Sequence, residues 1–194
     1  MNRLILLLGI VSLSAVGCLD PLRESRIEEL GPEQDGFGED EFHRVGQPCL
    51  ACHDGYGPGE PVMVFGGTIF AEPLYQDLVV LEGFTIRIID SEGQIFDTVS
   101  NRCGNFFIEK GEFDPAFPVR AELWGPPKPD SEDVIQLRPM TTRIGRDGSC
   151  GSCHIHPTSP VSPGVVYVPE AFLPPAEELS PPTDCPEPRF AEVF

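Results

Sequence analysis

The region from residue 62 to 138 is a series of short β-prone runs separated by turn residues. In one run, Phe84, Ile86 and Ile88 alternate with polar residues, which is typical of a strand with one buried face. The expected strands are 62–70, 84–90, 94–100, 106–109, 119–124 and 134–137, with a further short one at 165–168. Several short strands at turn-marked intervals predict a mainly β fold, a β-sandwich. The pair Gly66-Gly67 inside the first run predicts a β-bulge.

Part of this region resembles a known family. The matching stretches are Gly67-Thr68-Ile69, the run from Gly83 to Gly93, Thr98, and Gly104-Asn105-Phe106. Together they resemble the carboxypeptidase-regulatory-like family of transthyretin-type sandwiches, over about Val64 to Leu123. The resemblance implies an Ig/transthyretin-like sandwich and no activity, because the matching residues are turn and core positions.

The N-terminus has the features of an export signal. Met1-Asn2-Arg3 precedes an apolar run, Leu4 to Val16, that is too short to span a bilayer. The run ends in Ala15-Val16-Gly17-Cys18, which resembles a bacterial lipobox with Ala15 in place of the preferred Leu. Residues 1–17 are therefore predicted to be a lipoprotein-type signal peptide, with lipidation at Cys18 and plain secretion as the alternative. Leu19 after the cysteine favours the outer membrane, by resemblance to bacterial lipoproteins.

The rest of the chain is acidic and rich in turn-forming residues. It has 22 prolines, 20 glycines and a formal charge of -18, which argues against nucleic-acid binding and favours basic partners. Residues 18–45 are predicted to be an acidic, solvated tether, with a weak helical pattern around Leu22 to Leu30. Residues 165–194 are predicted to hold the final strand and an extended, Pro-rich tail.

Two Cys-x-x-Cys-His motifs flank the sandwich. Each lies in a loop rich in Gly and Pro, within segments 46–61 and 139–164, which are predicted as the first and second haem c segments. In a c-type cytochrome the two thiols bind the vinyl groups of one porphyrin and the histidine ligates the iron. The motif residues are Cys49, Cys52 and His53, and Cys150, Cys153 and His154. They predict two covalently bound haem c groups with His53 and His154 as proximal ligands.

Three other interpretations apply to these cysteines. They are a disulfide within each motif, a zinc site built from four cysteines, and a thioredoxin-like redox pair. Zinc ribbons usually keep their two knuckles closer together than these, and both knuckles here end in His. The redox pair would need a βαβ context, which the sequence does not show.

Two cysteines lie outside the motifs and the lipobox. Of seven cysteines, only Cys103 and Cys185 have no other assignment, and in an oxidising compartment they are a candidate disulfide.

The distal candidates are His43, His156 and, as the sulfur alternative, Met140; Met63 begins a strand and is expected to belong to the core. Two residues span at most about 7 Å, so His156 cannot serve the iron that His154 ligates. A crossed arrangement is preferred, with His156 on the first iron and His43 on the second, although His43 could also cap the iron of its own motif.

The function predicted from these features is electron transfer by an exported dihaem cytochrome, without enzymatic activity. Its partners would be redox proteins, among them other c-type cytochromes, and the membrane through the lipid anchor. Self-assembly through ligation between subunits is a variant of this prediction. The alternatives are a haem enzyme or gas sensor with one open iron, and a structural β-sandwich lipoprotein without haem.

Overall fold

The computed structural model of this protein describes residues 20–71, 78–126, 135–173, 179 and 182–190. Within this part the chain is mainly β, as predicted, and each expected run corresponds to a strand. The strands are β1 Met63–Ala71, β2 Thr85–Ile89, β3 Ile95–Val99, β4 Asn105–Glu109, β5 Arg120–Trp124, β6 Gln136–Pro139 and β7 Val166–Val168. The short helical elements are α2 Pro21–Leu30, α3 Leu50–His53, η2 Cys150–Ser152 and η3 Glu170–Phe172.

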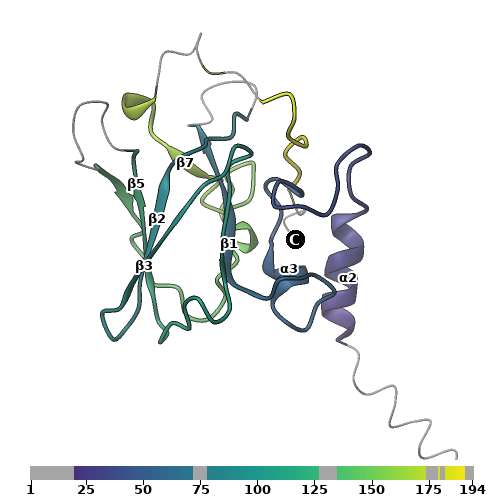
Figure 1. The fold of residues 1–194 in the computed structure, drawn as a ribbon, viewed down its shortest axis with the longest axis horizontal. Helices are drawn as coiled ribbons and strands as arrows, with labels where there is room; N and C mark the ends of the chain where they lie inside the picture. The colour runs from purple at the N-terminus through teal and green to yellow at the C-terminus, as the bar shows by residue number, and fades with distance from the viewer. Residues whose placement is uncertain (1–19, 72–77, 127–134, 174–178, 180–181, 191–194) are drawn as a thin grey trace, which may run out of the picture.

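The strands form two sheets (Figure 1). One has the order β4-β1-β7 and the other the order β3-β2-β5-β6. All neighbouring strands are antiparallel except β1 and β7, which are parallel. β1 follows the first motif in sequence, and β7 follows the second. The pairing of β7 with β1 therefore brings the two motif segments close together.

The core lies between the sheets. Ile69 of β1, Ile108 of β4 and Val168 of β7 come from the first sheet, and Ile88 of β2 and Leu123 of β5 come from the second. All five are buried and belong to one apolar cluster. Alternate residues of a strand face opposite sides of its sheet, so each sheet contributes one apolar face. Burial of these faces against each other is the main stabilisation of the predicted sandwich.

The predicted bulge at Gly66-Gly67 is wrong. The pairing of β1 with β4 is regular through both glycines, and the register shift lies earlier, between Met63 and Phe65. A glycine inside a strand can also mark a place where another segment approaches closely. Gly66 and Gly67 have this role here.

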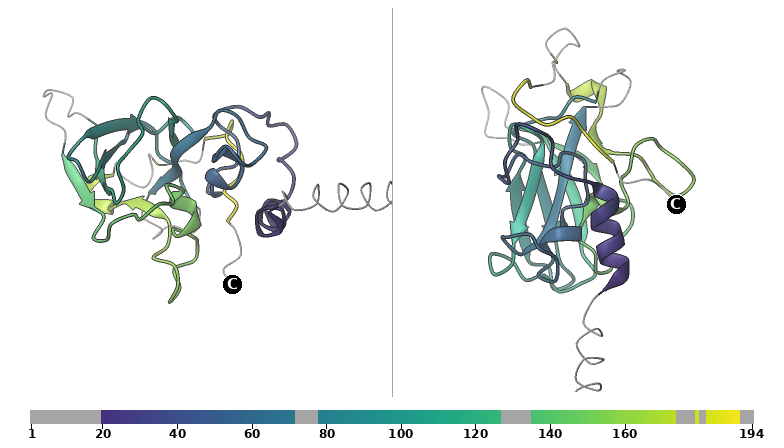
Figure 2. Two further views of the ribbon diagram at one scale, coloured as in Figure 1. Left: turned by 90° about the horizontal axis from the view of Figure 1, so that it is seen from below. Right: turned by 90° about the vertical axis from the view of Figure 1, so that its right-hand side faces the viewer.

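Residues 20–45, predicted to be an acidic tether with a weak helical pattern around Leu22 to Leu30, contain a helix and buried residues. Asp20 caps α2 by accepting hydrogen bonds from two backbone N–H groups of the first turn, and Leu30 at the end of this helix is buried. Val45 is fully buried in a small apolar cluster that includes Phe70. The cap and these apolar contacts outweigh the low hydrophobicity of the segment. α2 therefore lies beside α3 on the side of the sandwich that β1 occupies (Figures 1 and 2).

Other predicted segments lie partly outside the described residues. The signal peptide at 1–17 and the lipidation residue Cys18 are among those that the structure does not describe. In the described part of the chain, no helix has the length and apolar character needed to cross a membrane.

Candidate functional site

Both Cys-x-x-Cys-His motifs adopt the same helical turn. The backbone N–H of His53 donates to the carbonyl of Cys49 at 3.0 Å, and that of His154 donates to the carbonyl of Cys150 at 2.8 Å. The first turn belongs to α3 and the second to the end of η2. The short, Gly/Pro-rich loops around the motifs thus form one local structure twice.

The two motif histidines also share a second contact. Nδ1 of His53 lies 2.9 Å from the carbonyl oxygen of Pro61, and Nδ1 of His154 lies 2.9 Å from that of Gly164. A carbonyl oxygen only accepts hydrogen bonds, so Nδ1 carries the proton and donates in each case. Nε2 then keeps its lone pair, which is the arrangement that metal-binding histidines usually have.

The motifs approach β1 at adjacent residues. A Cβ built on Gly66 would lie 2.8 Å from the Cβ of Cys49, and one built on Gly67 would lie 2.8 Å from the Cβ of Cys150. Successive residues of a strand point to opposite faces, so the first cysteines of the two motifs contact β1 from its two sides. Both glycines are required for this approach because any side chain there would clash.

The motif segments also contact each other directly. Gly66 donates its N–H to the carbonyl of Gly148 at 3.1 Å and forms an isolated bridge with Ser149. A Cβ on Gly151 would lie 2.9 Å from the carbonyl oxygen of Gln47. Although the sandwich separates the two motifs in sequence, folding brings them together beside Gly66 and Gly67 of β1.

All four motif thiols are unpaired. Cys49, Cys52, Cys150 and Cys153 are free, whereas another pair of cysteines in the chain is bonded. Burial raises the pKa of Cys49 to about 11 and that of Cys150 to about 12. The disulfide interpretation of the motifs is therefore not the arrangement in this structure. Among the described residues, no three His, Cys, Asp or Glu side chains are grouped to hold a metal ion.

A cavity of about 460 Å³ adjoins the first motif. Cys49, Cys52 and His53 line it together with His43 and Met63. The rings of His43 and His53 are 5.8 Å apart between centres, with planes 27° from parallel. Nδ1 of His43 is buried and has no hydrogen-bond partner. Two thiols, an oriented imidazole and a second, unsatisfied imidazole in one cavity fit a covalently attached haem.

The position of His43 is set by contacts of its own backbone and of the next residue, Arg44. Asn105 of β4 donates its side-chain N–H to the carbonyl of His43 at 2.8 Å. The next residue, Arg44, has a left-handed φ of 50°, and its guanidinium binds Glu33 and the carbonyl of Gly31. Burial lowers the pKa of His43, which favours the neutral imidazole that a metal requires.

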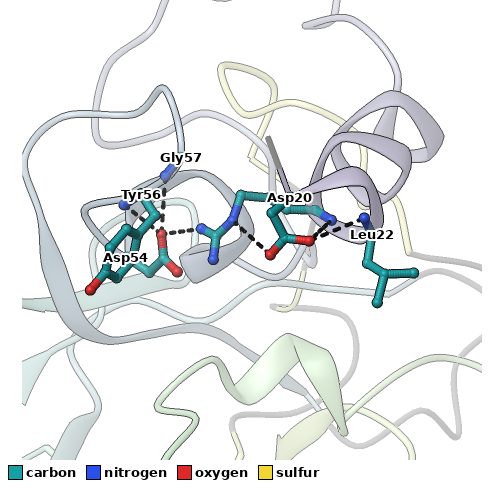
Figure 3. A network of polar contacts seen from close by, with 6 residues as sticks. Asp20, Leu22, Asp54, Tyr56 and Gly57 are labelled. Carbon is teal, nitrogen blue, oxygen red and sulfur yellow. Dashed lines mark hydrogen bonds and ion pairs between the residues drawn. The ribbon is translucent and has the colours of Figure 1, made fainter. Parts of the chain in front are cut away.

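An ion pair attaches α2 to the first motif (Figure 3). Arg23 of α2 pairs with Asp54, the residue after His53. Asp54 also accepts hydrogen bonds from the backbone N–H groups of Tyr56 at 2.9 Å and Gly57 at 3.1 Å. Burial by itself raises the pKa of Asp54, but the Arg23 guanidinium and the two backbone hydrogen bonds outweigh it and hold the pKa below its usual value. The loop after the first motif is thereby fixed to the helix.

A smaller hollow, of about 180 Å³, adjoins the second motif. His154 and Met140 both line it, and Phe106 lines this hollow as well as the larger cavity. Burial lowers the pKa of His154, although its hydrogen bond to Gly164 acts in the opposite direction. The two sites therefore share one buried aromatic residue in their walls.

The two candidate distal histidines have different surroundings, and the crossed arrangement of these ligands stays a prediction. His43 lies beside His53, the histidine of its own motif. His156 is exposed, and its ring lies 5.6 Å from that of Phe190. The hydrogen bond from Asn105 holds the backbone of His43 at the first motif.

The predicted disulfide is present. Cys103 is bonded to Cys185, with 5.5 Å between their Cα atoms, and it joins the C-terminal segment to the turn before β4. The residues that sequence reasoning missed are Asn105, Phe106, Pro61 and Gly164. Two of these act through backbone carbonyls, which have no signature in the sequence.

Comparisons with protein-family models, with curated proteins and with solved structures give no match for this chain.

Proposed function

We propose that this chain is an exported dihaem c-type cytochrome that relays electrons, and that it has no enzymatic activity. The observation that carries the proposal is the meeting of two similar motifs on Gly66 and Gly67 of β1. Two redox groups attached there would be neighbours within one molecule. Such an arrangement suits a relay better than two independent sites on opposite ends of a domain.

The motif residues would hold the haems. Cys49 and Cys52 would form the thioethers of the first haem, and Cys150 and Cys153 those of the second. Haem iron supplies one-electron oxidation and reduction. The hydrogen bond from Nδ1 of each motif histidine to a backbone carbonyl would orient the ring and increase its basicity.

Phe106 supports exchange between the two groups. It is 2 % exposed and lines both cavities, so this stretch of wall between the sites is apolar and excludes water. An aromatic residue in this position gives a short route through packed atoms. No substrate-binding group is needed for such a role.

The location and partners follow from the sequence. The N-terminal signal and Cys18 favour a lipid anchor in the bacterial cell envelope, most simply in the outer membrane on its periplasmic or outer face. The charge of -18 favours basic redox proteins, including other c-type cytochromes, and disfavours nucleic acid. The sandwich would act as the scaffold, and its relation to the carboxypeptidase-regulatory-like family is part of this proposal.

The test is expression of the full chain together with a c-type haem-maturation system. We expect a pyridine haemochrome spectrum of haem c and an intact mass that includes two haems. The matched variants Cys49→Ser/Cys52→Ser and Cys150→Ser/Cys153→Ser should each retain one haem. An intact mass without haem, or thiols that become free on reduction of motif disulfides, would overturn the proposal in favour of a structural lipoprotein.

A further inference from the structure

The two motifs differ in what lies opposite the motif histidine. At the first motif the side chain of His43 is 5.8 Å from that of His53, measured between ring centres. A metal–imidazole bond of about 2 Å on each side places two ring centres roughly 6 Å apart when one ion lies between them. The observed separation is close to that value.

The surroundings of His43 support a ligand role. Its Nδ1 is buried and unpartnered, so this polar atom lacks the hydrogen bond that burial normally requires. The backbone carbonyl of His43 accepts a hydrogen bond from Asn105, which holds this residue beside the cavity. A side chain whose backbone is held in place and whose buried ring nitrogen is unsatisfied is well suited to bind a metal on this side of the cavity.

The second motif has a different neighbour. The exposed His156 is two residues after His154 and lies against Phe190, and His43 is at the first motif. In the hollow beside His154 the soft donor is the thioether of Met140. The backbone N–H of Met140 donates to the carbonyl of Ala121 at 2.9 Å, which fixes this residue at the end of β6.

We propose that the two irons have unequal axial ligands, with His53 and His43 on the first and His154 and Met140 on the second. This inference rests on the proposed function, because it assigns ligands within the same two sites. A methionine ligand raises the reduction potential of a c-type haem relative to a second histidine. The second site is therefore the electron acceptor of the pair, and the relay has a direction within the molecule.

The experiment uses the full chain with both haems attached, and it starts with the unmodified protein. Haem content is measured first by pyridine haemochrome and intact mass, so a failure of the proposed function is seen before any ligand is tested. Magnetic circular dichroism and electron paramagnetic resonance of the oxidised protein should then show one bis-histidine and one histidine–methionine low-spin centre. Two identical centres, or a high-spin second iron, would overturn the inference.

Variants assign each ligand. His43→Gly should convert one low-spin centre to high spin, and added imidazole should restore it; the control His156→Ala should change nothing. Met140→Leu should abolish the sulfur-to-iron charge-transfer band, while Met63→Leu, at the methionine that lines the first cavity, should retain it. Loss of a low-spin centre in His156→Ala, or survival of the sulfur band in Met140→Leu, would disprove the assignment. The spectrum of the unmodified protein decides the matter if a variant fails to fold.

Discussion

Gly66 and Gly67 are two single residues on which the arrangement of both motifs depends. The Cβ that Gly66 lacks would meet the Cβ of Cys49 at 2.8 Å and its Sγ at 3.0 Å. The Cβ that Gly67 lacks would meet Cys150 and the ring of Phe106. Each glycine therefore acts by leaving space for a cysteine.

Substitution of either glycine should destabilise the fold. Gly67→Ala forces Cys150 or Phe106 to move inside a packed region, and overpacking of this kind costs about 1–3 kcal/mol. We expect that loss in the free energy of unfolding, measured by urea titration. The control is Gly145→Ala, because no atom lies within 4 Å of a Cβ at Gly145. Equal stability of the two variants would show that the motif does not pack on β1 as described.

Asp90 gives a prediction for pH. One carboxylate oxygen accepts hydrogen bonds from the N–H groups of Glu92 and Gln94, and the other accepts from Ala116. Burial by itself raises the pKa of Asp90, but these backbone N–H groups lower it below the usual 3.8. Because the folded pKa is the lower one, this carboxylate stabilises the fold fully above pH 3.8, and the contribution is lost as the pH falls toward the folded pKa.

Asp90→Asn should therefore flatten the acid side of the stability profile. An amide cannot accept at both positions, so the variant is less stable near neutral pH and loses less stability on acidification. Unfolding free energies measured from pH 3 to 7 check this expectation. Glu92→Gln, at an exposed carboxylate in the same turn, is the control. A variant profile parallel to that of the unmodified protein would contradict it.

At the scale of elements, the strands were predictable, whereas the sequence showed the helix before the first motif only as a weak pattern around Leu22 to Leu30. The alternation in β2 and the turn residues around it have a local cause, which a sequence shows directly. α2 has a weak apolar pattern, and what keeps it in place is tertiary: the pair Arg23–Asp54 and the burial of Leu30. The acidic composition of this segment indicated a solvated tether. The contacts that hold the helix involve residues elsewhere in the chain, such as Asp54, which the composition of the segment does not show.

The disulfide fixes the C-terminal segment to the turn before β4. It joins Cys103 to Cys185 across a sequence separation of 82 residues, and closing such a loop typically contributes about 2–4 kcal/mol. We expect a loss of that size in the unfolding free energy of Cys103→Ala/Cys185→Ala, measured by urea titration. In a thiol reductant the difference from the unmodified protein should disappear, because the reductant cleaves the same bond. A difference that persists in reductant would mean that the substitutions act through packing.

At the scale of the whole molecule, the charge of -18 favours basic partners for the proposed electron relay. Exposed charges attract opposite charges over about 10 Å at 0.1 M salt, and added salt screens them. The rate of electron exchange with a basic cytochrome should therefore fall steeply as ionic strength rises, in stopped-flow measurements. An acidic cytochrome should show the opposite trend, and a neutral small-molecule reductant should show no trend. A rate with the basic partner that is independent of salt would exclude electrostatic steering.

The sequence by itself determined the features that depend on local spacing. The strand positions follow from alternation and turn residues, and the disulfide follows from the two cysteines without another assignment. The chemistry proposed for the motifs rests on the adjacency of two thiols and an imidazole. Only the tertiary structure decided how the motifs are arranged. The pairing of β7 with β1 brings the second motif to Gly67, and Asn105 places His43 beside His53. These contacts join residues far apart in the chain, so their geometry depends on the packing of the whole sandwich and has no local pattern to indicate it.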